Sequence, residues 1–353
     1  MERKRVNFAI VGTRGIAKSH IKGISMTKEA ELTAVCDIHE DIVRNTAETY
    51  DVDAYYTNID EMLLRDDIDV VIIGTPDSAH REGTVKALRA GKHVLCEKPM
   101  ALLMEDCTEM IRVAKETGNM LMIGQVCRYA PGFIMAKKLL DAGEIGELFF
   151  VESEYAHDYT RNVGQDGWRI DPVNLRHPII GGGCHAIDLL RWLAGNPIEV
   201  SAYANKKVLT DWPVDDCTVA TMKFPNGVIG KVMTSVGCKR DYTMRTCLYG
   251  TKGTIITDNT SNTISLFKEE ICGERKYLDS ILCRGIEWKI PVEVASHNMA
   301  AEIKDMCEAV LTGQQPKTDG VEGASTVAVC DAVVRSAATG ERVMVDYSFK
   351  ERI

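Results

Sequence analysis

The sequence predicts two domains of different fold class. Residues 1–125 are expected to form an α/β domain with a doubly wound parallel sheet, and residues 126–353 an α+β domain with an open-faced, mostly antiparallel sheet. The first observation is the length of 353 residues, which exceeds what one hydrophobic core usually supports. The second is that buried strand patterns alternate with amphipathic helix patterns before residue 125. The third is that alternating strand patterns dominate afterwards.

The N-terminal domain shows strands and helices in regular alternation. Residues 70–73 form a continuous β-branched run ending at Gly74, as expected of a strand buried on both faces of a parallel sheet. The helix pattern of residues 82–90 stops at Gly91, a typical C-terminal position for glycine. The expected strands are residues 6–11, 32–37, 70–73 and 93–96, and the expected helices are residues 16–26, 42–50 and 82–90.

The second domain begins with one long helix pattern at residues 131–142 and continues mainly with strand patterns. The segment Phe224-Pro225-Asn226-Gly227 is a hairpin turn, because Asn-Gly readily adopts positive φ angles. The expected strands are residues 148–157, 198–204, 217–224, 228–236, 244–249 and 254–257. They are followed by helices at residues 299–311 and 320–338 and a last strand at residues 342–346.

Composition and charge exclude several classes of protein. With 45% apolar and 26% charged residues, the chain has the composition of a soluble globular protein. The formal net charge of −9 leaves no basic stripe for nucleic acid, and no segment approaches the length of a membrane span or a signal-peptide core. The 12 cysteines are scattered singly, without C-x-x-C pairs or clustered histidines, so we expect buried thiols in a cytoplasmic protein and no metal site.

A glycine-containing loop follows the first expected strand. The segment Gly12-Thr13-Arg14-Gly15-Ile16-Ala17 lies where a turn and a helix N-terminus can cradle a pyrophosphate. The match to G-x-G-x-x-[GA] is imperfect, because Arg14 replaces the second glycine. Asp37 ends the second strand about twenty residues after Ala17, where a carboxylate accepts the ribose hydroxyls of NAD and repels the phosphate of NADP. Alternatively, the loop is a plain turn, Asp37 caps a helix, and Arg14 favours NADP.

Two further segments follow buried strands and are expected at the same edge of the sheet, where ligands of open α/β sheets bind. The first is Thr75-Pro76-Asp77 with His80, for which the alternative is that Asp77 caps a helix and His80 packs against it. The second is Glu97-Lys98-Pro99, which sets an ammonium group at the carboxyl end of a strand. Its alternative is an ordinary turn lysine before a proline at the first helical position.

These segments, together with residues 90–99 (AGKHVLCEKP), resemble the Gfo/Idh/MocA family of glucose-fructose oxidoreductases and inositol dehydrogenases. Gly167-Trp168-Arg169, residues 185–189 and residues 313–345 support the resemblance, which covers nearly the whole chain. It implies a nicotinamide nucleotide in a Rossmann domain, a sugar or cyclitol against the open sheet, hydride transfer between them, and a homodimer or homotetramer. The cofactor-binding residues are predicted to be Gly12, Thr13, Arg14, Ile16, Ala17, Asp37, Thr75, Pro76, His80, Glu97, Lys98 and Gln125.

Lys98 occupies the position of the family's lysine, whose implied role is to hold and polarise the reacting hydroxyl or carbonyl group. Burial beside a cationic nicotinamide is expected to lower its pKa toward neutrality. The resemblance also implies an acid-base pair in the pattern D-x-x-x-H, and here the sequence departs from it. The histidine falls on His185, but the aspartate position falls on Gly181.

His185 could still exchange the substrate proton, and Asp188, one helical turn further on, could orient it. The alternatives are that His185 caps the helix of residues 186–194 or that His177 carries the proton. The three glycines at positions 181–183 predict extra room, so a larger substrate such as a glycoside is conceivable.

We predict Lys98 and His185 as catalytic residues. The substrate-binding residues are predicted to be Lys98, Arg128, Trp168, Arg169, His185 and Asp188, with His297 a weaker candidate.

The leading hypothesis is an NAD-dependent dehydrogenase, with NADP as the alternative cofactor, that oxidises a secondary hydroxyl of a sugar, a sugar derivative or an inositol. The second hypothesis is an NAD-retaining glycosidase or lyase that acts by transient oxidation and elimination. The third is a non-catalytic regulator that binds a nucleotide or a sugar.

Overall fold

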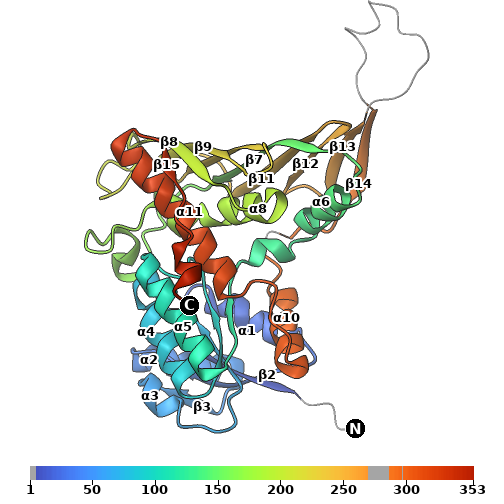
Figure 1. The fold of residues 1–353 in the computed structure, drawn as a ribbon. Coiled ribbons are helices and arrows are strands. Elements are labelled where there is room, and N and C mark those ends of the chain that lie inside the picture. Colours follow the sequence, from blue (N-terminus) through green and yellow to red (C-terminus); the bar gives the residue numbers. More distant parts are fainter. Residues whose placement is uncertain (1–4, 269–285, 296) are drawn as a thin grey trace, which may run out of the picture.

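A computed structural model describes residues 5–268, 286–295 and 297–353 and contains two sheets, one in each half of the chain (Figure 1). The first is a six-stranded parallel sheet with the strand order β3-β2-β1-β4-β5-β6. The second has nine strands in the order β14-β13-β12-β11-β7-β10-β9-β8-β15. The predicted fold class is confirmed. The boundary after residue 125 stays a prediction.

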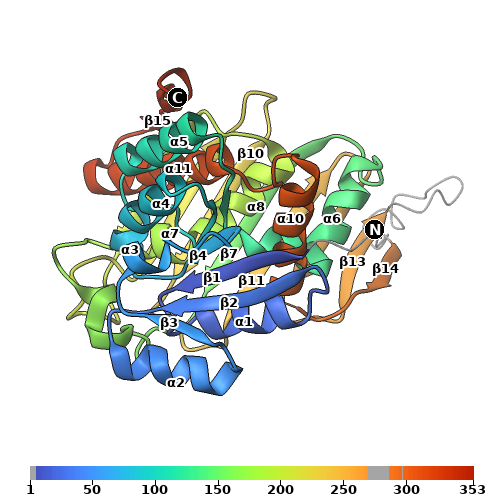
Figure 2. The same ribbon diagram turned by 90° about the horizontal axis from the view of Figure 1, so that it is seen from below.

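The parallel sheet follows the predicted alternation of strands and helices. The β-branched run forms β4, which pairs with β1 on one side and β5 on the other. It is fully buried because helices cover both faces of the sheet (Figure 2). The short elements β3 and α3 were not predicted. The elements are β1 (Val6–Val11), α1 (Ala17–Ser25), β2 (Ala30–Cys36), α2 (Glu40–Tyr50), β3 (Ala54–Tyr56), α3 (Ile59–Met62), β4 (Val70–Ile73), α4 (His80–Arg89), β5 (His93–Cys96), α5 (Met104–Thr117) and β6 (Leu121–Ile123).

The second half of the chain forms the nine-stranded sheet and the helices that pack against it. One pair, β7 and β10, is parallel, and the other strand pairs of this sheet are antiparallel. The elements are α6 (Pro131–Asp141), β7 (Leu148–Ala156), α7 (Pro178–Gly181), α8 (Cys184–Ala194), β8 (Glu199–Asn205), β9 (Cys217–Lys223), β10 (Ile229–Ser235), β11 (Thr243–Gly250), β12 (Gly253–Asp258), β13 (Thr263–Lys268), β14 (Ile286–Pro291), α10 (Met299–Thr312), α11 (Gly320–Thr339) and β15 (Val343–Met344).

Two C-terminal helices connect the halves. Figure 1 shows α8 and α11 on the side of the nine-stranded sheet that faces the parallel sheet, and α11 also contacts α5 and β6. Helix α10 packs against α1, where a Cβ atom on Gly23 would lie 2.9 Å from Met299 Cβ. The chain therefore returns to the first domain after building the second, which the sequence patterns did not predict.

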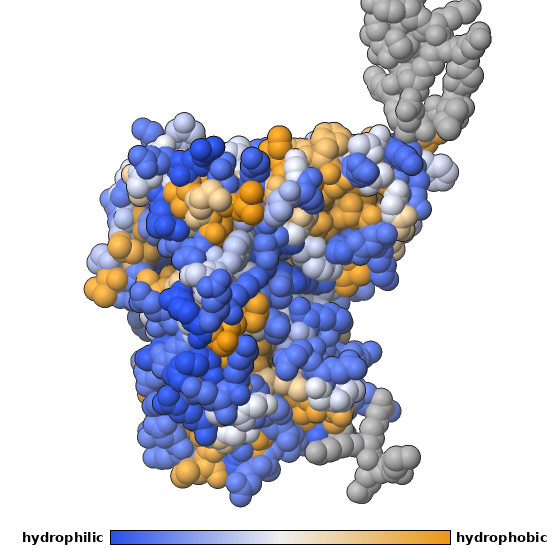
Figure 3. All heavy atoms as spheres, in the orientation of Figure 1, coloured by the Kyte–Doolittle hydropathy of each residue, from blue (hydrophilic) through white to orange (hydrophobic). Residues whose placement is uncertain are grey.

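The other side of the nine-stranded sheet carries exposed apolar side chains, among them Tyr203, Val219 and Ile229. Figure 3 shows hydrophobic patches in the upper half of the molecule, where this sheet lies, on a surface that is otherwise largely hydrophilic. A homodimer or homotetramer remains a prediction. In the parts of the chain that the structure describes, no helix has the length and apolar character needed to cross a bilayer.

Candidate active site

A cleft of about 1080 Å³ lies between the carboxyl edge of the parallel sheet and the nine-stranded sheet. The loops after β1, β2, β4 and β5 line one side, and β7, the segment Gln165–Ile170 and α8 line the other. Ligands of open α/β sheets bind at such an edge. The predicted site residues that line the cleft are Gly12, Arg14, Ile16, Asp37, Thr75, Pro76, His80, Glu97, Lys98, Trp168, Arg169 and His185.

The glycine loop has the geometry of a phosphate cradle. Gly12 has a φ of +84°, and a Cβ atom there would lie 2.7 Å from the carbonyl oxygen of Gly74, so only glycine lets the β1 and β4 loops approach this closely. Beside Gly15 the space is open, because a Cβ atom would meet nothing within 4 Å. The N-terminus of α1 has no side-chain cap, and the hydroxyl of Thr75 is buried without a partner. These free donors fit the phosphates of a dinucleotide.

Asp37 lies at the end of β2, as predicted, and the loop holds it in place. Its Oδ2 accepts hydrogen bonds from the Thr13 amide (3.0 Å) and the Thr13 hydroxyl (3.2 Å). The N-cap of α2 is His39, so Asp37 does not cap that helix. Arg14 is held across the cleft by an ion pair with Asp166, with 3.1 Å between Nη1 and Oδ2. Thr13 and Ala17 support the loop from behind and do not line the cleft.

His80 packs beneath the β4 loop. Its Nδ1 lies 2.9 Å from the carbonyl oxygen of Pro99 and its Nε2 lies 3.1 Å from that of Thr75. Both nitrogens face acceptors. Burial lowers the pKa of His80. Cys96, Asp77 and the Pro99 carbonyl raise it by more than burial lowers it, so the pKa lies above its usual value. This histidine therefore joins the loops after β4 and β5.

Glu97 and Lys98 follow β5 directly. The carboxylate of Glu97 contacts His20 Nε2 (2.8 Å) and accepts a hydrogen bond from the amide of Lys98 (3.0 Å). Burial alone would raise the pKa of Glu97, but the hydrogen bond from His20 and the charge of Lys98 lower it to about 2. Glu97 is therefore an anion fixed behind Lys98 at neutral pH.

The Lys98 ammonium has neither a hydrogen bond nor an ion pair with any described residue. Burial lowers its pKa, but Cys184 and Glu97 raise it more, so the net shift is upward. The expected fall toward neutrality concerns Lys98 beside a bound cationic nicotinamide, and it stays a prediction. Lys98 is a cation that faces the cleft.

His185 is the second residue of α8 and is 3% exposed. The helix has no side-chain cap, so His185 does not cap it. Burial, Lys98 and His297 lower the pKa of His185 well below its usual value. Its imidazole is therefore neutral at physiological pH and able to accept a proton.

The prediction that Gly181, Gly182 and Gly183 leave extra room for a substrate is wrong. Cβ atoms at these positions would lie 2.0 Å from Arg176 Nη1, 2.5 Å from the Tyr155 ring and 2.2 Å from the Thr234 hydroxyl. The space is filled by protein. Arg176 occupies the place next to the missing family aspartate.

Arg176 joins the two halves of the cleft. Its Nε donates to Asp77 Oδ2 (2.5 Å) and its Nη2 donates to the carbonyl oxygen of Gly181 (3.0 Å). Both side chains of the Arg176–Asp77 pair are almost fully buried. Asp77 therefore binds an arginine from the second domain.

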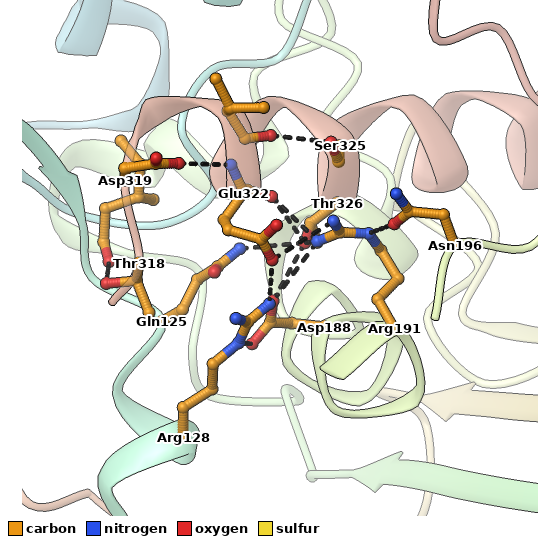
Figure 4. A network of polar contacts seen from close by, with 12 residues as sticks. Gln125, Arg128, Asp188, Arg191, Asn196, Thr318, Asp319, Glu322, Ser325 and Thr326 are labelled. Atoms are coloured by element: carbon orange, nitrogen blue, oxygen red, sulfur yellow. Dashed lines mark hydrogen bonds and ion pairs between the residues drawn. The ribbon is translucent and has the colours of Figure 1, made fainter. Parts of the chain in front are cut away.

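Arg128 and Asp188, predicted to bind substrate, belong instead to a buried ionic network (Figure 4). Arg128 donates to both oxygens of Asp188 (2.6 and 2.8 Å) and to Glu322 (2.7 Å). Arg191 Nη1 lies 3.7 Å from Asp188 Oδ1 and donates to the Thr326 hydroxyl (2.7 Å). Neither predicted residue lines the cleft, and the oxygens of Asp188 are engaged by these partners, so we assign both a structural role.

Gln125 lies at the edge of this network. Its amide nitrogen donates to the Thr326 hydroxyl (2.9 Å), and its carbonyl oxygen is buried without a partner. It lines a small cavity of about 10 Å³ together with Lys98 and His185 rather than the main cleft.

Sequence reasoning missed an aromatic group on the second-domain side of the cleft. The hydroxyls of Tyr155 and Tyr159 lie 2.7 Å apart, and Tyr242 stacks on His297 with ring centroids 5.6 Å apart. His157 lies between these rings. The alternation of Tyr155, His157 and Tyr159 was the available signal, since period-two residues share one face of a strand.

Three candidate metal ligands meet beside Lys98. Ligand atoms of Cys127, His185 and His297 lie within 4.8 Å of one another, although the residues are far apart in the sequence. Burial raises the pKa of Cys127 and lowers the pKa of His185 and His297, and the positive charge of Lys98 acts on all three groups. An ammonium that close also repels a divalent cation, so we retain the expectation of no metal site.

Comparison with known proteins defines first the class and then the family. Residues 6–125 match the model of an oxidoreductase family with an NAD-binding Rossmann fold, and residues 133–256 match the GFO/IDH/MocA C-terminal domain. The N-terminal domain is thus an NAD-binding Rossmann domain. The chain belongs to the Gfo/Idh/MocA family of oxidoreductases, which confirms the resemblance seen in the motifs.

Individual relatives are distant but match along nearly the whole chain. The 1,5-anhydro-D-fructose reductase of Ensifer adhaerens is 26% identical over 347 residues, which cover 96% of this chain and 98% of that protein. The myo-inositol 2-dehydrogenase of Thermotoga maritima is 25% identical over 331 residues, covering 90% and 92%. A solved levoglucosan dehydrogenase in complex with NADH and L-sorbose gives a TM-score of 0.87 at 21% identity, covering 97% and 99%, and supports the fold.

Proposed function

We propose that the protein oxidises a secondary hydroxyl of a sugar, a sugar derivative or an inositol, with NAD as hydride acceptor. The observation that supports this most directly is the position of Lys98. It lies at the carboxyl end of β5, in the cleft that runs from the glycine loop to His185, and has no anionic partner in an ion pair among the described residues. Relatives with nearly full coverage include an inositol dehydrogenase and an anhydrofructose reductase.

The two catalytic residues have different protonation states, which suits different tasks. The Lys98 ammonium donates a hydrogen bond to the reacting oxygen and polarises it. The neutral His185 accepts the hydroxyl proton while the C–H bond breaks, its electron pair leaves as hydride, and the carbon–oxygen double bond forms. NAD, when bound, supplies the carbon that accepts the hydride. In the reverse direction, His185 returns the proton.

The preference for NAD over NADP rests on the nucleotide end of the cleft. The Asp37 carboxylate at the end of β2 is suited to ribose hydroxyls and repels a 2′-phosphate. Arg14, which could attract that phosphate, is paired with Asp166. We therefore expect a lower KM for NAD than for NADP.

Lys98→Ala tests the proposal. We expect NADH formation with the best substrate from a panel of sugars and inositols to fall about 10²–10³-fold, the range typical of a lost donor that stabilises charge on the reacting oxygen. NADH binding, followed by fluorescence titration, should be retained. Lys115→Ala, which removes an exposed lysine on α5, is the matched control and should keep full turnover. Unchanged turnover in Lys98→Ala would contradict the assignment.

The same measurements separate the three hypotheses. Accumulation of NADH in proportion to substrate consumed supports net oxidation. Cleavage of a chromogenic glycoside with only catalytic NAD would instead support transient oxidation and elimination. Nucleotide binding without turnover of any sugar would support a regulator.

A further inference from the structure

The substrate side of the cleft is rich in cations. Lys98, Arg161, Arg169 and Arg176 line it together with uncharged aromatic side chains. The nearby carboxylates are already engaged: Asp77 binds Arg176, Glu97 binds His20, and Asp166 binds Arg14. Within the described ranges, Lys98, Arg161 and Arg169 form no ion pair with a carboxylate.

The three histidines on the substrate side of the cleft, His157, His185 and His297, add no positive charge at neutral pH. Burial lowers the pKa of His157 and His185, and it lowers that of His297 to about 4. All three are therefore neutral. The charge of this region is set by its lysine and arginines, although the whole chain carries a net charge of −9.

Arg169 is held in a fixed orientation. Its guanidinium stacks on Trp168, 4.5 Å from the ring centroid, and its Nη1 donates to Asn162 Oδ1 (3.1 Å). Its Nε is buried without a partner. The guanidinium lines the cleft and carries a charge that no carboxylate of the described residues pairs with, so it is available to a ligand anion.

We infer that the substrate is a sugar acid, whose carboxylate binds the guanidinium of Arg169 where it lines the cleft, while its reacting hydroxyl lies against Lys98. This inference rests on the proposed function. Arg169 is half-buried and has no carboxylate partner among the described residues, so a substrate carboxylate would compensate a charge that the protein leaves unpaired. Phosphate oxygens pair with a guanidinium in the same way, so the experiment includes a phosphate arm that distinguishes the two anions.

The test compares acids with their neutral parents on the purified full-length chain with NAD. The pairs are glucuronate and glucose, and galacturonate and galactose, with glucose 6-phosphate as the phosphate arm. We expect kcat/KM for the better acid to exceed that for its parent by about tenfold to a hundredfold, as for a charge-assisted hydrogen-bonded pair. An equal or higher value for every neutral sugar, or for the phosphate, would overturn the inference.

Arg169→Gln tests whether Arg169 is the residue that binds the substrate carboxylate. It should reduce the ratio of acid to neutral kcat/KM at least about tenfold, chiefly through KM for the acid. Arg169→Lys keeps the charge but loses the two parallel donors, so it should recover only part of the ratio and covers the case in which the glutamine variant does not fold. Arg335→Gln, at an exposed site on α11, should keep the ratio. An unaltered ratio in both Arg169 variants would refute the assignment.

Binding separates this inference from the proposed function. Calorimetric titration of glucuronate and galacturonate into the protein–NADH complex requires no turnover. Binding that weakens in Arg169→Gln supports the carboxylate site even if no sugar is oxidised. Turnover of neutral sugars with no binding of either acid would leave the dehydrogenase proposal standing and remove the sugar acid.

Discussion

Two groups of charged side chains, the ionic network around Asp188 and the floor of the cleft, differ in how their charges are paired. In the network, Arg128 and Arg191 contact Asp188 and Glu322 at 2.6–3.7 Å (Figure 4). In the cleft, the Lys98 ammonium and the Arg169 guanidinium have no carboxylate partner among the described residues. Burial penalises a charge unless a partner compensates it. The paired charges around Asp188 stabilise the fold, whereas the unpaired charges of Lys98 and Arg169 line the cleft and are available to a ligand.

Breaking the network should give the largest effect on stability. Asp188→Asn removes the shared anion and leaves Arg128 and Arg191 with Glu322 alone, so the free energy of unfolding should fall by about 3–5 kcal/mol. Urea unfolding at neutral pH measures this. Asp331→Asn, which breaks the exposed Asp331–Arg335 pair, is the control and should change it by less than about 0.5 kcal/mol. Similar losses in both variants would contradict the comparison.

Restoring the family aspartate should destabilise this protein. In Gly181→Asp the new Cβ atom would lie 2.0 Å from Arg176 Nη1 and must displace that side chain. We expect a loss of about 1–3 kcal/mol in the free energy of unfolding, the usual cost of overpacking. Adding Arg176→Ala makes room but leaves Asp77 buried without its partner, so the double variant should not regain the stability of the parent protein. A single variant as stable as the parent protein would show that Arg176 moves aside without cost.

Glu302 is a buried acidic side chain without a hydrogen-bond partner among the described residues, in contrast to the paired charges of the network. It is fully buried on α10, neither carboxyl oxygen has a hydrogen-bond partner, and burial together with Glu97 raises its pKa well above 4.5. A raised carboxyl pKa gives stability that is complete below the unfolded pKa and is lost as the pH rises toward the folded pKa. Glu302→Met should therefore stabilise the protein by about 1–3 kcal/mol near pH 8, because it removes an unsatisfied buried group.

The gain from Glu302→Met should shrink as the pH falls from the folded pKa of Glu302 toward about 4.5, and it should stay constant below that, where the carboxyl is protonated in both states. Thermal unfolding across this pH range measures the gain. Glu308→Met, at an exposed position on the same helix, should show no such pH dependence. Destabilisation by Glu302→Met near pH 8 would mean that the carboxyl has a favourable role in the folded protein.

The pH dependence of turnover should follow His185. Since its pKa lies well below 6.5, kcat/KM for oxidation should not decrease through loss of the neutral imidazole between about pH 8 and pH 6.5, and should fall about tenfold per pH unit only below the pKa. Initial rates of NADH formation give the profile. His185→Gln should remove this acidic limb, whereas His177→Gln should keep it. A limb centred above 6.5 would contradict the neutral, buried imidazole.

Metal removal should have the smallest effect. Because the Lys98 ammonium opposes a cation at Cys127, His185 and His297, dialysis against a chelator should leave turnover unchanged, and metal analysis should find far less than one zinc ion per chain. One tightly bound zinc ion that is lost in Cys127→Ser would show that the three residues form a metal site.

Local patterns predicted much of the fold and the nucleotide side of the cleft. The β-branched run of β4 and the loop from Gly12 to Ala17 carry their signal within a few consecutive residues, and the carboxyl ends of parallel strands then meet at one edge. The substrate side was harder to predict. Arg176 and Tyr242 belong to no motif, and Asp188 lies at a position that suggested catalysis until its partners from other helices were known.

The sequence by itself determined the class of fold, the family, and the position of Lys98 at the end of β5, because period and local motifs fix strands, helices and the turns between them. Only the tertiary structure decided which charges are paired. It brought Arg128 to Asp188 and Arg176 to Asp77, filled the space beside Gly181, and left Arg169 without a carboxylate partner among the described residues. These ion pairs join residues that are far apart in the chain and come into contact only when the domains pack together. A local sequence pattern therefore cannot predict them.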